Sequence, residues 1–214
     1  MRDFSYVDIV FSLVWAARWT LLLSTIAFVG GGAAGFLLLL LRISTLPPLQ
    51  YLSRLYAEVV QGTPLLIQFL LVFFGLSIVG INIDAWTAAI LVLTIFTSAF
   101  LSDIWRGAVE SVSKGQWEAA QAVSLGYFQQ LGLVILPQAL RLSIAPTVGF
   151  LAQVIKGTSL ASAIGFVELA RTATNIANVT FEPFFVYLVT AVVYFGICFP
   201  ISLVSRRLER SLQY

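Results

Sequence analysis

The sequence has no histidine and a single cysteine, Cys198. The common zinc and iron–sulfur ligand sets and every cysteine–histidine catalytic pair are therefore excluded. No stretch matches GxxxxGK[S/T], the loop that binds nucleotide phosphates, so a site for ATP is not expected in this chain. Cys198 lies in an apolar run, where we expect it to pack as a small hydrophobic residue. We predict no catalytic residue, no metal site and no cofactor.

Charged residues are also scarce. Only 10% of the 214 residues are charged and 59% are hydrophobic, whereas soluble proteins average about 25% charged residues. Such a chain has more apolar surface than a soluble domain of this size could bury, which indicates an integral membrane protein. The net charge of +2 comes from scattered basic residues, not from a stripe, so nucleic acid is not an expected partner.

The long apolar runs predict an all-α protein with five transmembrane helices. Four uncharged runs are long enough to cross a bilayer, at residues 19–41, 59–83, 85–102 and 184–205. A fifth crossing begins at residue 142, but Pro146, Gly149, Gly157 and Gly165 interrupt it, so we expect it to be discontinuous. No internal repeat relates the two halves, which disfavours the transporters built on inverted repeats.

The remaining segments are shorter or more polar. Residues 1–18 hold an apolar run too short to cross a bilayer and are predicted to be an N-terminal interfacial segment, with a cleaved signal peptide as the alternative. Residues 168–183 are polar enough for an outer loop, and residues 211–214 form a C-terminal tail. Asp103 and Arg106, three residues apart, are expected to form a structural ion pair.

Residues 116–141 form the longest central stretch that cannot lie in lipid, because Glu118, five glutamines and Arg141 would need polar partners there. The helical periodicity breaks at residues 124–126, and Pro137 is expected to end or kink a second helix. Two short helices joined by a bend form a docking surface more readily than the lining of a pore. An ordinary solvated hairpin is the alternative.

This stretch resembles the EAA loop of the permease subunits of bacterial ABC importers, and its flanks resemble the group that takes up polar amino acids. The similarity extends from about residue 20 to residue 210. The motifs that carry it are Glu118-Ala119-Ala120, Ile135-Leu136-Pro137, Gly62-Thr63-Pro64-Leu65-Leu66, Gly115-Gln116, Leu136-Pro137-Gln138-Ala139-Leu140-Arg141, and Lys156 followed by Thr158-Ser159-Leu160.

The resemblance implies the type I importer permease fold over residues 19–210, with short cytoplasmic coupling helices in an EAA loop at residues 114–141. It also implies a second permease subunit, identical or related, two cytoplasmic ATPase subunits that hold ATP and Mg, and an extracytoplasmic solute-binding protein. The residues expected to contact the ATPase are Gly115, Gln116, Glu118, Ala119, Ala120, Ser124, Leu125, Gly126, Ile135, Leu136 and Pro137.

A polar amino acid presents an ammonium and a carboxylate, and both need partners in a desolvated path. Lys156 is the most informative group, because a lysine at membrane depth is costly unless it is paired, hydrated or extended to the interface. The residues predicted to line the path are Gln61, Thr63, Gln68, Thr97, Ser98, Gln153, Lys156, Thr158 and Ser159. We expect Gly62-Thr63-Pro64 to bend the helix beside a transport cavity, and a plain helix kink is the alternative.

Some positions depart from the family pattern. Many relatives have arginine where Gln61 stands, glycine where Ser124 stands, an acid where Gly157 stands, and a polar pair near Gly149 and Phe150. Ser124 can still adopt a turn, so coupling is expected to survive. The missing polar pair suggests that substrate contacts come mostly from the partner permease, which makes a heteromeric pair a live hypothesis.

The basic residues predict the orientation. With the EAA loop in the cytoplasm, eight basic residues lie inside and three, Arg2, Arg18 and Arg171, lie outside, with Lys156 uncounted. The N-terminus is therefore expected outside and the C-terminus inside the bacterial inner membrane. The alternatives are a passive channel or membrane-assembly protein that binds a partner through the loop, and a permease for another small solute such as methionine or an opine.

Overall fold

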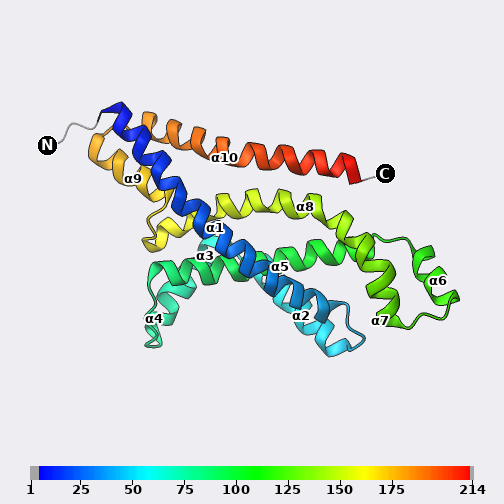
Figure 1. The fold of residues 1–214 in the computed structure, drawn as a ribbon. Helices are drawn as coiled ribbons and strands as arrows, with labels where there is room; N and C mark the ends of the chain where they lie inside the picture. The colour runs from blue at the N-terminus through cyan, green and yellow to red at the C-terminus, as the bar shows by residue number, and fades with distance from the viewer. Residues whose placement is uncertain (1–4, 213–214) are drawn as a thin grey trace.

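The computed structural model describes residues 5–212, in which all regular structure is helical (Figure 1). Residues 1–4, which include Arg2 and the start of the predicted interfacial segment, lie outside the described residues. Residues 213–214 of the predicted tail do so as well.

Helix α1 (Tyr6–Arg42) runs without a break through residue 18, where the sequence analysis placed the end of a separate segment. No proline interrupts these 37 residues. The Ser5 hydroxyl accepts the Val7 N–H, and the Asp8 carboxylate accepts the Ser5 N–H. Two backbone N–H groups at the start of α1 are thus satisfied by a capping box. Residues 6–18 therefore lead directly into the first span. The Arg18 guanidinium lies 3.9 Å from the ring centroid of Trp15.

The second span predicted at residues 59–83 bends at Gly62-Thr63-Pro64, as expected, but so sharply that it forms two separate helical parts. Helix α2 (Pro47–Gln61) is followed by α3 (Leu65–Leu70), the π-helical turn η1 (Leu71–Gly75) and α4 (Leu76–Ile78), and the two parts meet at 100°. Pro64 has no N–H and takes an extended conformation, which stops the helix. The Gln68 amide donates to the carbonyls of Val60 (2.7 Å) and Thr63 (3.0 Å), which this break would otherwise leave unpaired.

Helix α5 (Ala85–Glu110) forms the centre of the bundle and packs closely along α1. Asp84 caps α5, and its hydrogen bonds, first that from the Thr87 hydroxyl, lower the pKa of the Asp84 carboxyl. The close approach depends on glycines of α1, because a Cβ added at Gly31 would lie 2.4 Å from the Thr97 Cβ and one at Gly35 would lie 2.9 Å from the Ser98 carbonyl oxygen.

The fourth crossing is more continuous than its prolines and glycines predicted. Helix α7 (Tyr127–Gln129), the π-helical segment η2 (Gln130–Ile135), α8 (Leu136–Gly157) and the 3-10 segment η3 (Thr158–Ile164) form one helical path. Of the helix end or kink expected at Pro137, the helix end is wrong, because the wider turns of η2 precede this proline and accommodate it. The interruptions expected at Pro146 and Gly149 are wrong, but the helix changes type after Gly157 and ends before Gly165, which has φ of 89°.

The predicted outer loop at residues 168–183 is mostly helix. Helix α9 (Leu169–Thr180) is amphipathic and lies between the start of α1 and the start of α10 (Pro183–Leu212) (Figure 1). Its buried face joins α1 and α10 in an apolar cluster of Ile9, Leu13, Ala17, Leu169, Ala173, Ile176, Ala177 and Val186. The short polar side chains of the segment led to the loop prediction, but they occupy only one face of the helix.

The chain passes between the two ends of the molecule up to five times, if the bent pair formed by α2 and α3–α4 is one crossing (Figure 1). Four helical stretches in the described residues are individually long and apolar enough to span a membrane. The N-terminal start of α1 and α9 lie at one end, and α6 (Lys114–Ala122) and the end of α10 lie at the other (Figure 1). The all-α membrane fold predicted from the sequence is confirmed.

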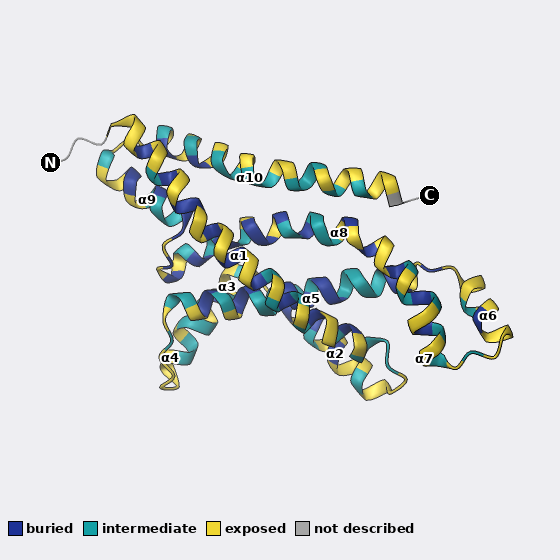
Figure 2. Ribbon diagram, in the orientation of Figure 1, coloured by how far each residue is buried: buried dark blue, intermediate teal, exposed yellow. Residues whose placement is uncertain are grey.

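Apolar residues cover the outside of this bundle. Figure 2 shows long exposed stretches on α1 and α10, and Val192, Phe195 and Leu188 of α10 are among the exposed large hydrophobic residues. The main buried cluster lies between α1, α5 and α8 and includes Leu23, Leu93 and Val154. An apolar exterior around a packed core suits a molecule surrounded by lipid or by a second membrane subunit.

We predict that Gly31→Ala destabilises the protein by about 1–3 kcal/mol, because the new methyl group must push α1 away from Thr97 of α5. Thermal unfolding in detergent, followed by helical circular dichroism, measures the effect. Gly107→Ala is the matched control, since nothing lies within 4 Å of a Cβ at Gly107. A Gly31→Ala protein that unfolds at or above the temperature of the control would contradict the packing described here.

Candidate functional site

Helix α6 and the turn that follows it form the projecting end of the molecule (Figure 1). The helix ends at Val123, and Ser124 takes the left-handed conformation with φ of 61°. The Gln130 amide then donates to the Leu125 carbonyl at 2.6 Å, and the Gln129 side chain accepts the Gly126 N–H at 3.0 Å. The turn predicted at residues 124–126 is confirmed, and glutamines of the next helix satisfy its backbone groups.

One face of α6 is fixed to the bundle. Ala120 is buried, and the ring of Trp117 stacks with that of Tyr127 at a centroid distance of 6.3 Å. The Tyr127 hydroxyl donates to the carbonyl of Ile43, which follows α1, and the Gln138 amide of α8 donates to the Gln116 side chain at 3.2 Å. A small apolar cluster continues into α5 and α8 through Ala108, Val109, Val112, Leu131, Ile135 and Ala139. Helix α6 is therefore attached to three crossings at once.

The other face of α6 is free of the bundle. Some of the residues predicted from the sequence to contact the ATPase are exposed, and others are half-buried or buried. The exposed ones are Gly115, Gln116, Glu118, Ala119, Ser124, Gly126 and Pro137, with Leu125 and Leu136 half-buried and Ala120 and Ile135 buried. Val123 and Phe128 flank this surface and are strongly exposed, although the sequence analysis did not select them. The arrangement presents a carboxylate, small side chains and two apolar side chains to a partner.

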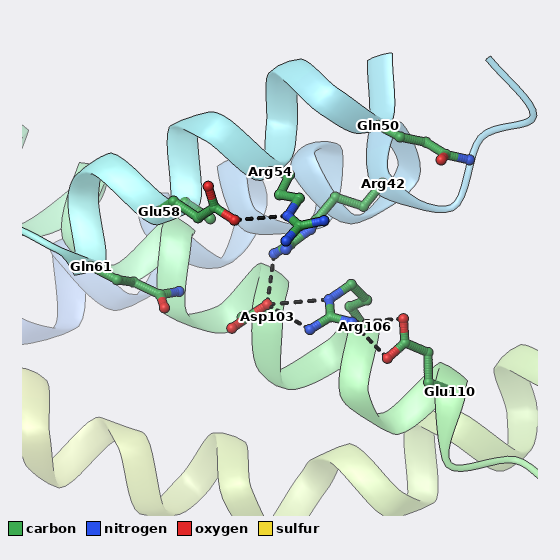
Figure 3. Close-up of a pocket in the computed structure, with 9 residues that line it drawn as sticks. Arg42, Gln50, Arg54, Glu58, Gln61, Asp103, Arg106 and Glu110 are labelled. Atoms are coloured by element: carbon green, nitrogen blue, oxygen red, sulfur yellow. Dashed lines mark hydrogen bonds and ion pairs between the residues drawn. The ribbon is translucent and has the colours of Figure 1, made fainter. Parts of the chain in front are cut away.

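Behind α6, the ends of α1, α2 and α5 carry a network of charged side chains (Figure 3). Asp103 lies between two guanidinium groups, 2.7 Å from Arg42 and 3.1 Å from Arg106. Arg106 also contacts Glu110 at 2.6 Å. The predicted pair of Asp103 and Arg106 is confirmed. The contact of Asp103 with Arg42, 61 positions earlier, was not predictable from the sequence.

A pocket of about 440 Å³ opens beside this network and is lined by Gln61 together with Gln50, Arg54, Ala57 and Glu58 of α2. Arg54 and Glu58 pair at 2.7 Å, so the lining holds three arginines and three carboxylates. These opposite charges in the lining balance one another. Gln61 itself donates to the Ala99 carbonyl at 3.2 Å and joins α2 to α5.

Within residues 5–212, the residues predicted to line a substrate path are spread over several places. Thr63 and Gln68 line an apolar groove of about 620 Å³ between α2–α4 and α5, where Gln68 also bonds the Thr63 hydroxyl at 3.0 Å. Gln153 and Lys156 are exposed on α8. Ser159 donates to the Lys156 carbonyl at 2.7 Å.

The other three path residues are buried between helices. Thr97 contacts α1 at Gly31, and its hydroxyl is without a hydrogen-bond partner among the described residues. Ser98 lies 2.8 Å from the Tyr56 hydroxyl, and Thr158 donates to the Ile155 carbonyl at 2.7 Å. In this arrangement these three side chains are not accessible from the surface of the chain.

Sequence analysis also missed a buried polar group at the opposite end of the molecule. Glu168 was placed in an outer loop, whereas its carboxylate is fully buried and receives hydrogen bonds from Thr20 of α1 and Tyr194 of α10. Glutamate is not a favoured N-cap residue, and its partners are 148 and 26 positions away, so no local signal in the sequence indicated the contact.

Residues 29–214 match the model of the family described as binding-protein-dependent transport system inner membrane component. The probable amino-acid ABC transporter permease protein YckA of Bacillus subtilis strain 168 is 34% identical, over 90% of this chain and 85% of the relative. The glutamine transport system permease protein GlnP of Escherichia coli strain K12 is 33% identical, over 94% of this chain and 93% of the relative.

Two solved structures are similar over nearly the whole chain. A chain in the crystal structure of an amino acid ABC transporter with histidines superposes with a TM-score of 0.92 at 31% identity, covering 99% of both chains. A chain of the methionine ABC transporter MetNI in an inward-facing conformation superposes with a TM-score of 0.70 at 21% identity, covering 97% of this chain and 96% of that one. At this lower identity the second likeness concerns the fold alone.

We predict that Asp103→Asn destabilises the protein by about 2 kcal/mol, because Arg42, whose side chain is only 9% exposed, then loses its carboxylate partner. Glu58→Gln is the control, since it breaks a pair whose side chains are 69% and 58% exposed and should cost less than about 1 kcal/mol. Thermal unfolding in detergent compares the two. Equal shifts would show that the Arg42 contact contributes no more than a surface pair.

Proposed function

Because the chain belongs to the family of inner membrane components of binding-protein-dependent transport systems, we propose that it is the subunit that couples partner ATPases to amino-acid import through α6. The family is one of multi-pass inner-membrane permeases, and the chain has the type I fold of an amino-acid ABC transporter, as the sequence predicted. The relatives are named as permeases for glutamine, L-cystine or unspecified amino acids, and one for nopaline. A polar amino acid is therefore the proposed substrate.

One observation carries the coupling proposal: α6 is held rigidly on one face and is free on the other. The free face offers Glu118 for a polar contact and Ala119 for close approach, with Val123 and Phe128 as apolar neighbours. The held face would transmit a displacement, because Trp117 packs against the apolar cluster of α5, η2 and α8 and stacks with Tyr127. A surface with these two faces is suited to seat in a groove of an ATPase.

Movement at α6 would pass along the molecule through the helical path from Tyr127 to Ile164, which has no gap at Pro137. Closure of two ATPases on ATP and Mg would push α6. The helical path would carry this displacement to η3, its last segment, at the opposite end of the molecule. The reaction of the permease is thus a change between two packed arrangements, and ATP hydrolysis belongs to the partner subunits. No cofactor is proposed for this chain itself.

A second permease subunit is proposed to complete the translocation path. The exposed Gln153 and Lys156 of α8 lie on an outer face of the chain, where a like subunit could enclose them in a shared cavity. Gln61, Thr63, Gln68 and Ser159 remain proposed wall residues. Thr97, Ser98 and Thr158, buried in this arrangement, would contact the solute only if the helices around them separated. A path with so few charged wall residues is compatible with a heteromeric pair of permease subunits and with a homodimer.

The proposed orientation places α6 and the C-terminus in the cytoplasm, and the N-terminus and α9 outside. Arg42, Arg54, Arg106, Lys114 and Arg141 then lie at the cytoplasmic end, in agreement with the positive-inside rule. An extracytoplasmic solute-binding protein would dock at the α9 end.

Two alternatives are kept. A passive channel or membrane-assembly protein would bind a partner through α6 without ATP-dependent uptake, and the family membership weighs against it. A permease for another small solute keeps the same mechanism. The likeness to MetNI concerns the fold, and it does not favour methionine over other solutes.

We predict that Glu118→Lys weakens co-purification of this chain with its ATPase subunit by about tenfold or more, because a reversed charge in a close interface costs several kcal/mol. The two chains are co-expressed with an affinity tag on the ATPase only. Glu182→Lys, which reverses an exposed charge at the α9 end, is the control and should leave the complex intact. A wild-type chain that never co-purifies with an ATPase would overturn the proposed coupling and favour the channel or assembly alternative.

A further inference from the structure

The Glu168 carboxylate is the one fully buried acidic side chain in the part of the chain that the structure describes. It stands at the start of α9, at the end of the molecule opposite α6 (Figure 1). Its environment is the junction of two apolar clusters. Ala17 of α1 belongs to the cluster with α9 and α10, while Leu23 belongs to the main core, and Thr20 lies between them and faces Glu168.

The carboxylate receives three hydrogen bonds from three different helices. One oxygen accepts the Arg171 N–H of α9 at 2.9 Å. The other accepts the hydroxyls of Thr20 at 3.1 Å and Tyr194 at 2.9 Å. The Thr20 hydroxyl oxygen in turn accepts the Leu169 N–H at 3.2 Å. Capping α9 needs only the first of these bonds, so the other contacts serve to join α9 to α1 and α10.

The cluster is sensitive to any movement of its members. No ion pair of the described residues includes Glu168, so its charge relies on these neutral donors and on the first turn of α9. A buried carboxylate that loses donors is strongly destabilised unless water reaches it. Helix α9 can thus be either fully docked or released and hydrated, and positions between the two are unfavourable.

We propose that Glu168 is the positioning residue that holds α9 docked on α1 and α10 and thereby keeps this end of the molecule closed. Opening of the end requires the Glu168 bonds to Thr20 and Tyr194 to break. The inference rests on the proposed function, in which the permease changes between two packed arrangements. It assigns the closed state of this end to the hydrogen bonds of Glu168 with Thr20 and Tyr194. This is the end where the solute-binding protein is proposed to dock.

The first test measures whether α9 is released. In a Cys198→Ser background, Ala177→Cys places a thiol on the buried face of α9, and a membrane-impermeant maleimide reports how often that face is exposed. Tyr194→Phe removes one hydrogen bond and should speed labelling about fivefold, with Glu168→Gln at least as fast. Tyr187→Phe on the same helix and Glu182→Gln, both changes of exposed side chains, should leave the rate unchanged.

The second test separates a gate from a purely structural contact. In the purified complex with its ATPase, Tyr194→Phe should raise ATP hydrolysis without binding protein about fivefold and leave the rate with loaded binding protein unchanged. A merely structural contact would lower both rates. Unchanged labelling in Tyr194→Phe and Glu168→Gln, or faster labelling with both ATPase rates reduced, would overturn the inference. A wild-type complex without ATPase activity would instead overturn the proposed function. The wild-type rate therefore distinguishes failure of the proposed function from failure of this inference.

Discussion

The architecture depends on one constraint, that every backbone N–H and carbonyl in an apolar surrounding needs a partner from within the protein. Helices satisfy it over most of the chain, and side chains satisfy it where helices stop. Gln68 bonds the carbonyls freed before Pro64, Gln130 bonds the Leu125 carbonyl in the turn after α6, and Thr20 and Glu168 bond the first N–H groups of α9. Each break in the helical path is thus a fixed feature of the fold.

Continuous helices join the two ends of the molecule, and each end holds a short helix that packs on them. At one end α6 is attached through Trp117 and Tyr127 to the end of α1 and to the α7–α8 path. At the other end α9 is attached through Glu168 to α1 and α10. Helix α1 and the path from Tyr127 to Ile164 both run between these ends. In the proposed coupling, they are the elements that would carry a displacement of α6 toward α9.

Long apolar runs and motifs with defined spacing were predictable from the sequence, because their physical basis is local. The spans of α1, α5 and α10 and the turn at Ser124 follow from composition and from turn-forming residues. The 100° bend at Pro64 and the uninterrupted helix through Pro137 were not predictable, because a proline can break, bend or merely widen a helix according to its tertiary neighbours. Arg42 with Asp103 and Thr20 with Glu168 join residues far apart in the chain, and one sequence carries no signal of such pairs.

The central claim is that this chain is the membrane path of an ATP-driven importer for a polar amino acid. Uptake of radiolabelled glutamine, cystine and arginine into proteoliposomes tests it most directly, with the permease, its ATPase and its binding protein present and ATP enclosed. The account predicts uptake of at least one of these amino acids that requires both ATP and the binding protein. Accumulation to the external concentration without ATP would contradict it and would identify a passive channel.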